Sequence, residues 1–178
     1  MGKWFWIILC YSFGGYLLER LFAVATKAPK QVRKCCLLLP LCPVYGLAMA
    51  LHLALLPREY SIWELMLRGM AVTTAVEYGV HLFYERVAGV RFWDYTAVRG
   101  NLNGRICLPF SAAWGVLSAG AVVWLQPAVE RAVGRIPPEV TFVMLLTVTV
   151  DLCLSLRLLR CSGDTELLSW QAVVRRFG

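Results

Sequence analysis

The sequence predicts an all-α membrane protein, a polytopic bundle of about five transmembrane helices. Hydrophobic residues make up 59% of the 178 residues, charged residues make up 16%, and the mean hydropathy is +0.62. A soluble domain is nearer half apolar and a quarter charged. Five apolar segments each approach the roughly 20 residues that a helix needs to cross about 30 Å of hydrocarbon. They are Trp4–Thr26, Leu37–Pro57, Leu65–Ala88, Leu108–Pro127 and Val140–Leu159.

The five predicted spans differ in how many polar residues interrupt them. The first has no charge until Glu19, and the second has Pro40 and Pro43 near its start. The third is the most polar, the fourth has no charge, and the fifth is interrupted by Asp151 and Arg157. An acid at a helix centre costs about 2.5–3.5 kcal/mol on insertion scales. We still predict the third and fifth spans, because their apolar flanks are long.

The end of the chain reads as a separate short unit. We assign residues 1–160 to a transmembrane domain and residues 161–178 to a cytoplasmic amphipathic tail. Within Asp164–Phe177 the apolar residues fit one helical face, with Arg175 and Arg176 off that face. This pattern predicts an interfacial helix on the inner leaflet.

The distribution of basic residues predicts the orientation. Of the 18 Lys and Arg residues, twelve fall in the connections and tail on one side of the five spans and five fall on the other. Basic loops stay in the cytoplasm, so the N-terminus is predicted outside and the C-terminus inside a bacterial inner membrane. The net charge of +7 then reflects topology and anionic lipid, and it does not require nucleic-acid binding.

Two pairs of segments suggest an internal repeat. "LPLCPVYG" (Leu39–Gly46) matches "LPFSAAWG" (Leu108–Gly115) in Leu, Pro and Gly, and "LLER" (Leu17–Arg20) matches "FYER" (Phe83–Arg86). Both copies would cross the membrane in the same direction. The sequence therefore predicts a parallel 2+2 repeat with the fifth span added, and repeat interfaces are where transporter sites lie.

Ionisable residues inside the predicted spans are the first candidates for a transport or polar site. Glu77, His81 and Glu85 fall at i, i+4 and i+8 and share one face of the third span. Asp151 lies near the middle of the fifth, and Glu19 lies at the inner end of the first. Such residues are costly and usually face a partner or a water-filled path. The functional hypothesis is a cation or proton site between the third and fifth spans. The alternative is interhelical hydrogen bonding, and for Glu19 and Glu85 we favour local pairing with arginines.

The residue patterns favour neither a metal site nor a recognised enzyme. The Glu77–Glu85 stripe spans two helical turns, about 11 Å, so one ion cannot touch both ends. The seven cysteines form no C-x-x-C and no zinc-type spacing. There is no G-x-x-x-x-G-K-[ST], G-x-S-x-G or H-E-x-x-H. We therefore expect no metal and no cofactor, and no catalytic residue is assigned.

A polar, glycine-containing connection separates the third and fourth spans, in Phe92–Gly115. Asn103-Gly104 is a turn signal, and Pro109 can start the next helix. Polar side chains there could satisfy backbone groups in a packed turn, form a functional cytoplasmic face, or do both. The candidate residues of this motif are Trp93, Asp94, Tyr95, Asn101, Gly104, Arg105, Ser111 and Trp114.

The same residues resemble a known family. "RFWDY" and "NLNGRICLPFSAAWG", preceded by "EYGV", are similar to motifs of the CmpB-type bacterial ABC-transporter permeases, also called ABC-transporter type IV. Gly15–Glu19 and "CPVYG" (Cys42–Gly46) are similar to motifs of the family's N-terminal half. The resemblance covers roughly Gly15 to Gly115 and implies a permease-like membrane protein.

Three functions remain open at this point. The first is the membrane subunit of a transport system, with a separate ATP-binding subunit and a solute moving past Glu77 and Asp151. Because five spans are few for a complete transporter, we expect a dimer or a hetero-complex. The second is a membrane scaffold or regulatory protein in which the acids are structural. The third, which we rank last, is a lipid-modifying membrane enzyme.

Overall fold

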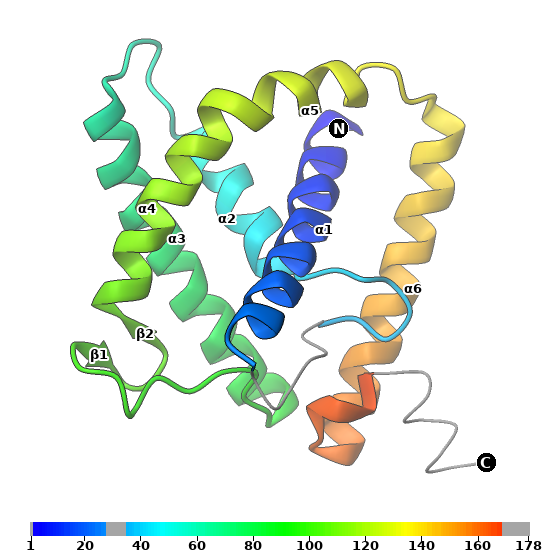
Figure 1. The fold of residues 1–178 in the computed structure, drawn as a ribbon. Helices are drawn as coiled ribbons and strands as arrows, with labels where there is room; N and C mark the ends of the chain where they lie inside the picture. Colours follow the sequence, from blue (N-terminus) through cyan, green and yellow to red (C-terminus); the bar gives the residue numbers. More distant parts are fainter. Residues whose placement is uncertain (1, 28–34, 169–178) are drawn as a thin grey trace.

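The structure is a helical bundle that carries one short hairpin (Figure 1). It is a computed structural model that describes residues 2–27 and 35–168. The predicted all-α class is confirmed. In chain order the elements are α1 (Gly2–Ala25), α2 (Pro43–Ala54), α3 (Ile62–Phe83), the π-helical turn η1 (Tyr84–Ala88), β1 (Asn101–Leu102), β2 (Ile106–Cys107), α4 (Leu108–Gly120), the π-helical turn η2 (Ala121–Leu125), α5 (Gln126–Val133), α6 (Pro138–Ser162) and the 3-10 turn η3 (Thr165–Leu168).

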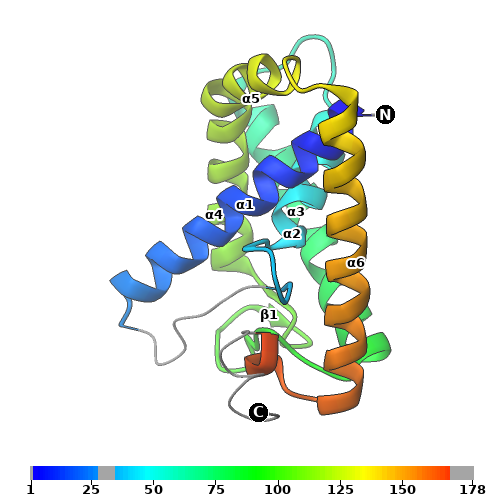
Figure 2. The ribbon, with the colours of Figure 1, turned by 90° about the vertical axis from the view of Figure 1, so that its right-hand side faces the viewer.

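Within the described residues, three helical segments are long and apolar enough to cross a membrane. They are Gly2–Ala25, Leu108–Val133 and Pro138–Ser162, and they correspond to the first, fourth and fifth predicted spans. Leu108–Val133, which corresponds to the fourth predicted span, joins α4, η2 and α5 into one helix. Its last part turns across the top of the bundle in Figure 1. Figure 2 shows α1 crossing the bundle obliquely while α6 stands along one side. The number of spans and the repeat stay predictions.

Prolines and a capping box set where several helices begin. Pro43 and Pro138 are the first residues of α2 and α6, where a missing backbone N–H costs nothing. α3 begins at a capping box, in which Ser61 Oγ accepts from the Glu64 N–H at 3.2 Å and Glu64 Oε2 accepts from the Ser61 N–H at 2.9 Å. These local signals position the helix ends without help from the rest of the fold.

Glycines let the helices pack as two close pairs, α1 with α2 and α3 with α4. A Cβ atom on Gly46 of α2 would overlap the carbonyl oxygen of Ile8 in α1. A Cβ atom on Gly115 of α4 would lie 2.7 Å from the carbonyl oxygen of Met66 in α3. Small residues at these crossings bring the backbones together, which is the usual basis of helix association in membranes.

The predicted second span is wrong over its first six residues. Its helix begins at Pro43, whereas residues 35–42 form a non-helical segment, called the strap below, that reaches towards α6 (Figure 1). Cys35 and Cys42 at its two ends are buried, whereas Leu38 at its middle is exposed, so only the ends of the strap lie in the packed interior. Irregular backbone at membrane depth is stable only where protein satisfies its polar groups. The strap therefore needs hydrogen-bond acceptors from other elements.

The predicted tail helix falls largely outside the described residues. Within the described part, Thr165–Leu168 forms the 3-10 turn η3, in which Leu167 and Leu168 are buried. Leu168 belongs to the same apolar cluster as Leu159 of α6 and Tyr84 of η1. The start of the predicted tail is thus packed against the bundle. Its division from residues 1–160 stays a prediction.

Candidate functional site

The polar connection after α3 folds into a tight antiparallel hairpin. Asn101 pairs with Cys107 and Leu102 pairs with Ile106, so three residues, Asn103, Gly104 and Arg105, remain between the strands. The Arg105 N–H donates to the Leu102 carbonyl at 3.1 Å, and the two residues between them have positive φ, 55° at Asn103 and 67° at Gly104, as expected for a type I′ turn. A Cβ atom on Gly104 would also lie 2.8 Å from the Asp94 carboxylate, so both the positive φ and this close approach require glycine at position 104. The end of the bundle that carries this hairpin, η1 and η3 is called the hairpin end below.

Side chains of the predicted motif satisfy the backbone of this connection. Asp94 Oδ1 accepts from the Thr96 N–H at 2.8 Å, and this hydrogen bond holds the pKa of the Asp94 carboxyl below its usual range. Asn101 donates to the Val98 carbonyl at 2.7 Å and accepts from the Gly104 N–H at 3.1 Å. The connection is therefore held together by hydrogen bonds among its own residues.

Glu85 ties the hairpin to the end of α3. Arg105 donates to Glu85 Oε2 from Nη2 at 2.7 Å and from Nε at 3.0 Å, and this bonding raises the pKa of the Arg105 guanidinium. Arg91 pairs with the other oxygen of the same carboxylate. The guanidinium carbon of Arg105 also lies 5.4 Å from the ring centroid of Tyr78. Glu85 thus pairs locally with arginines of the connection, as the sequence favoured.

His81 lies one turn before Glu85 and is 3% exposed. Its Nε2 is 3.0 Å from the carbonyl oxygen of Trp93. Because a carbonyl only accepts hydrogen bonds, Nε2 carries the proton and Nδ1 of the neutral ring has the free lone pair. Nδ1 makes no hydrogen bond, and it lies 3.8 Å from Glu85 Oε2.

Glu77 lies a further turn into the bundle and is 5% exposed. Its Oε1 accepts a hydrogen bond from the hydroxyl of Tyr95 at 3.0 Å. The Trp114 indole is a further polar neighbour of this carboxylate, but Glu77 Oε2 and Trp114 Nε1 each lack a hydrogen bond of normal geometry. Tyr95 and Trp114, both predicted as residues of the cytoplasmic motif, thus contact this buried acid.

The two helix pairs meet through aromatic rings beside this carboxylate. Tyr45 of α2 packs edge-to-face on Trp114 of α4, with ring centroids 4.9 Å apart. The Tyr45 hydroxyl donates to Glu19 of α1 at 2.7 Å, and Gly15 leaves room for the Tyr45 ring. Tyr45 and Trp114 are aligned by the predicted repeat. Tyr45 contacts Glu19, and Trp114 is a neighbour of Glu77. By these contacts Glu19 is the counterpart of Glu77, whereas the alignment of "LLER" with "FYER" makes Glu19 the counterpart of Glu85.

Asp151 lies apart from Glu77 and holds the strap. Its carboxylate accepts from the backbone N–H groups of Leu37 at 3.1 Å, Leu38 at 3.0 Å and Leu39 at 2.7 Å. Ser155, one turn along α6, accepts from the same Leu37 N–H at 2.8 Å. α6 packs on α1, η1 and η3, whereas Glu77 lies where α3, α4 and α2 meet. The structure therefore does not form the expected site between the third and fifth spans.

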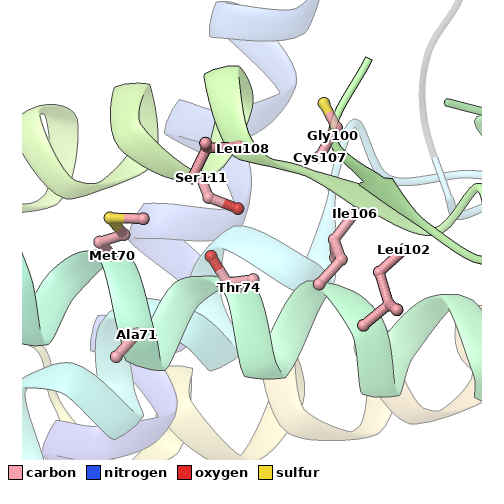
Figure 3. A pocket seen from close by; sticks show the side chains of 9 residues that line it. All are labelled: Met70, Ala71, Thr74, Gly100, Leu102, Ile106, Cys107, Leu108 and Ser111. Carbon is pink, nitrogen blue, oxygen red and sulfur yellow. The ribbon is translucent and has the colours of Figure 1, made fainter. Parts of the chain in front are cut away.

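A small cavity lies between α3, the hairpin and the first turn of α4 (Figure 3). Its volume is about 290 Å³, and Thr74 and Ser111 supply the hydroxyl groups in its wall. Glu77 does not line it. The lining residues are Met70, Ala71, Thr74, Gly100, Leu102, Ile106, Cys107, Leu108 and Ser111.

Three residues of this region were not among the candidate site residues. Tyr45 donates to Glu19, Tyr78 accepts from Arg105, and Arg91 shares Glu85 with Arg105. Each had a sequence signal, since Tyr45 lies in "CPVYG", Tyr78 in "EYGV" and Arg91 in "RFWDY", the motifs that carry the family resemblance. In the part of the chain that the structure describes, no three His, Cys, Asp or Glu side chains are grouped to hold a metal ion.

The comparisons with known proteins bear on what this fold is. No curated protein and no solved structure matches the chain. A family model matches residues 6–156, which extends the resemblance seen in the motifs in both directions. Together with the long apolar helices, the match fits a membrane protein related to transport. The chain belongs to the family described as "Putative ABC-transporter type IV".

Proposed function

We propose that this protein is the membrane subunit of a transport system that works with a separate ATPase, and that Glu77 lies on the route of the transported species. Membership of an ABC-transporter-type family supports the transport role. The contrast between Glu77 and Asp151, two buried acids in one bundle, supports the place of Glu77 on the route.

Asp151 represents a structural acid in this protein. It is 0% exposed, and its two oxygens accept three backbone N–H groups. Glu77 is nearly as buried, but its Oε2 makes no hydrogen bond of normal geometry and has the Trp114 indole as a polar neighbour. A buried polar group left without a partner costs about 1–3 kcal/mol, more when charged. An acid kept at that cost between two helix pairs is typical of a site that binds something, and this is the observation that carries the proposal.

The hairpin end supplies the surface for the ATPase. Thr96, Ala97 and Arg99 are exposed on the outer side of the connection, while Arg105 anchors it to Glu85. A docking surface must be firmly joined to the transmembrane helices if nucleotide-driven movement is to reach them. The excess of basic residues supports a cytoplasmic position for this end, where an ATP-binding subunit works.

Affinity purification from native membranes in mild detergent, followed by mass spectrometry, tests the proposal. We expect an ATP-binding subunit in stoichiometric amount with the wild-type chain. Arg99→Glu should reduce its recovery several-fold, because the substitution reverses the charge of the docking surface. Arg58→Glu, an exposed arginine in the α2–α3 connection, is the matched control and should not. Recovery of the protein alone would overturn the ATPase partnership.

A scaffold without transport activity is the second candidate. Asp151 favours it, because this acid is fully used in holding the strap to α6. The same purification separates the two functions. A single homo-oligomeric species without nucleotide-binding protein would support the scaffold.

A further inference from the structure

We propose that His81 and Glu77 form a proton relay, which carries a proton from the hairpin end of α3 to the interface between the two helix pairs. The species bound at Glu77 is then a proton. This inference deepens the proposed function, since it names the ion that the transport route handles. It rests on the geometry of one helix face and on no partner protein.

The first support is a pair of unused lone pairs on neighbouring turns. Glu77 Oε2 and His81 Nδ1 are both buried, and neither makes a hydrogen bond of normal geometry in the described residues, although the Trp114 indole is a polar neighbour of Glu77. The two residues are 5% and 3% exposed. One orphaned buried atom can be a local packing compromise, but these two belong to residues at i and i+4 on one helix face, whose Cβ atoms are about 5–6 Å apart. Because the Trp93 bond fixes the imidazole with Nδ1 towards Glu85, the relay uses one bridging water molecule between Nδ1 and Glu77.

The second support is that the environment holds each residue ready for proton transfer. The Trp93 carbonyl holds the Nε2–H of His81 in a hydrogen bond, so Nδ1 is the ring nitrogen that can accept a proton. Glu85 Oε2 lies 3.8 Å from Nδ1, close enough to stabilise the imidazolium once it forms. Glu85 is partly exposed at the hairpin end, so a proton from water has a short way to His81.

The charged and titratable groups around the relay come from every neighbouring element. His81 is near Glu85 of η1 and Asp94 of the connection, and Arg91 and Arg105 share the Glu85 carboxylate. Glu77 meets Tyr95 of the connection and Trp114 of α4, with Glu19 of α1 across the interface and Tyr45 of α2 between them. No described Lys or Arg makes an ion pair with Glu77. The acid therefore has no fixed cation to neutralise it.

The surroundings of Glu77 suit a proton better than a larger cation. A hard metal ion takes about six oxygen ligands, and the described residues include no group of three metal-binding side chains. An organic cation needs space, and the cavity beside α3 is not lined by Glu77. A proton needs a single lone pair, which Glu77 Oε2 has.

The transfer consists of two balanced steps. In the first, an O–H bond of a hydronium ion at the hairpin end breaks, which leaves water, and an N–H bond forms at His81 Nδ1. The Nε2–H stays on the Trp93 carbonyl, and the ring becomes an imidazolium facing Glu85. In the second, the Nδ1–H bond breaks as its proton passes to a bridging water molecule, which gives up one of its own protons to form the O–H bond at Glu77 Oε2. His81 is then neutral again, and Glu77 holds the proton as a carboxylic acid.

Infrared difference spectroscopy on the purified full chain in lipid nanodiscs tests this relay. The carbonyl stretch of a protonated carboxylic acid is followed during titration between about pH 4 and about pH 9, which spans ordinary and buried carboxylates. The rate of its appearance is then measured after a rapid downward pH jump. Glu77→Gln should remove the band, and its amide oxygen still accepts from Tyr95. His81→Gln should keep the band but slow its appearance by about tenfold or more, because glutamine donates to Trp93 and has no titrating nitrogen.

His52→Gln is the matched control. His52 is also buried with both ring nitrogens unpartnered, but it lies on α2, away from the stripe. The His52→Gln variant should leave both the carboxylic-acid band and the rate of its appearance unchanged. A band that persists in Glu77→Gln, or equal rates in His81→Gln and the wild type, would overturn the relay, as would equal slowing in His52→Gln. All these readouts use the isolated chain, so they fail independently of the ATPase purification.

Discussion

Asp151→Asn probes the link between the strap and α6. In the wild type the carboxylate receives three N–H groups, two on Oδ1 and one on Oδ2. An asparagine is isosteric but has one acceptor oxygen and one donor nitrogen. Its oxygen can keep Leu37 and Leu38, whereas its NH2 group must face the N–H of Leu39, where two donors meet.

The expected cost follows from these contacts. The lost bond to a charged acceptor is worth about 1.5–3 kcal/mol, and the orphaned N–H of Leu39 costs about 1–3 kcal/mol. The two figures overlap, and the strap can relax, so we expect a loss of about 2–4 kcal/mol in the free energy of unfolding. For a chain of this length each kcal/mol lowers the Tm by about 2–4 °C. Asp151→Asn should therefore lower the Tm by about 4–16 °C.

Thermal unfolding in detergent, followed by intrinsic tryptophan fluorescence, measures this change. Glu139→Gln is the control, because Glu139 is an exposed acid on the same helix. It should shift the Tm by less than about 2 °C, since surface substitutions usually change stability by under about 0.5 kcal/mol. If Asp151→Asn shifted the Tm no more than Glu139→Gln does, the carboxylate would not be holding the strap, and the structural role assigned to it would be refuted.

Three further predictions concern the helix pairs and the hairpin. Gly15→Ala should destabilise the protein by about 1–3 kcal/mol, because its methyl group would overlap the Tyr45 ring of α2. Gly14→Ala has open space around its methyl group and should stabilise the protein by up to about 1 kcal/mol. Thermal unfolding of both variants measures the difference. Arg105→Ala should expose the hairpin to limited proteolysis, while Arg58→Ala should not, and equal cleavage would contradict the anchoring role. The hydrogen bond to Asp94 lowers its folded pKa, so its contribution to stability is present above the ordinary pKa of about 4 and is lost as the pH falls through the lower folded value. Hydrogen exchange of the connection should rise in that acidic range, and Asp94→Asn should flatten the dependence.

Helix type and approximate ends were predictable because they depend on local chemistry. Length and apolarity identified the segments that became α1, α4 and α6, and the turn signal at Asn103-Gly104 identified the hairpin. The strap was missed for a related reason. An apolar run such as Leu37–Leu41 has the same hydropathy whether it is helical or extended, and Pro40 and Pro43 were read as irregularities near a helix start. The non-helical form is stable because a distant carboxylate, that of Asp151, accepts hydrogen bonds from its backbone N–H groups.

The sequence predicts which residues lie at the candidate site, but it does not predict which of them contact each other. The i, i+4, i+8 spacing placed Glu77, His81 and Glu85 on one face, and the structure keeps them there with three different environments. The sequence grouped Glu77 with Asp151, because both are acids within apolar segments. Which helices are neighbours depends on the close glycine contacts and on the Tyr45–Trp114 pair, and hydrophobic periodicity contains no such information.

The strap also constrains the order in which the chain can reach its final form. The N–H groups of Leu37–Leu39 and their acceptor Asp151 are separated by 112 to 114 residues. α6 is the last of the long helices to leave the ribosome, so the first connection has no acceptor for these groups while α2 to α5 are being made. The N-terminal helix pair therefore stays unfinished until synthesis is nearly complete. A chain cut between α5 and α6 would lack more than one helix, because its first connection would also be left without a stable place in the bundle.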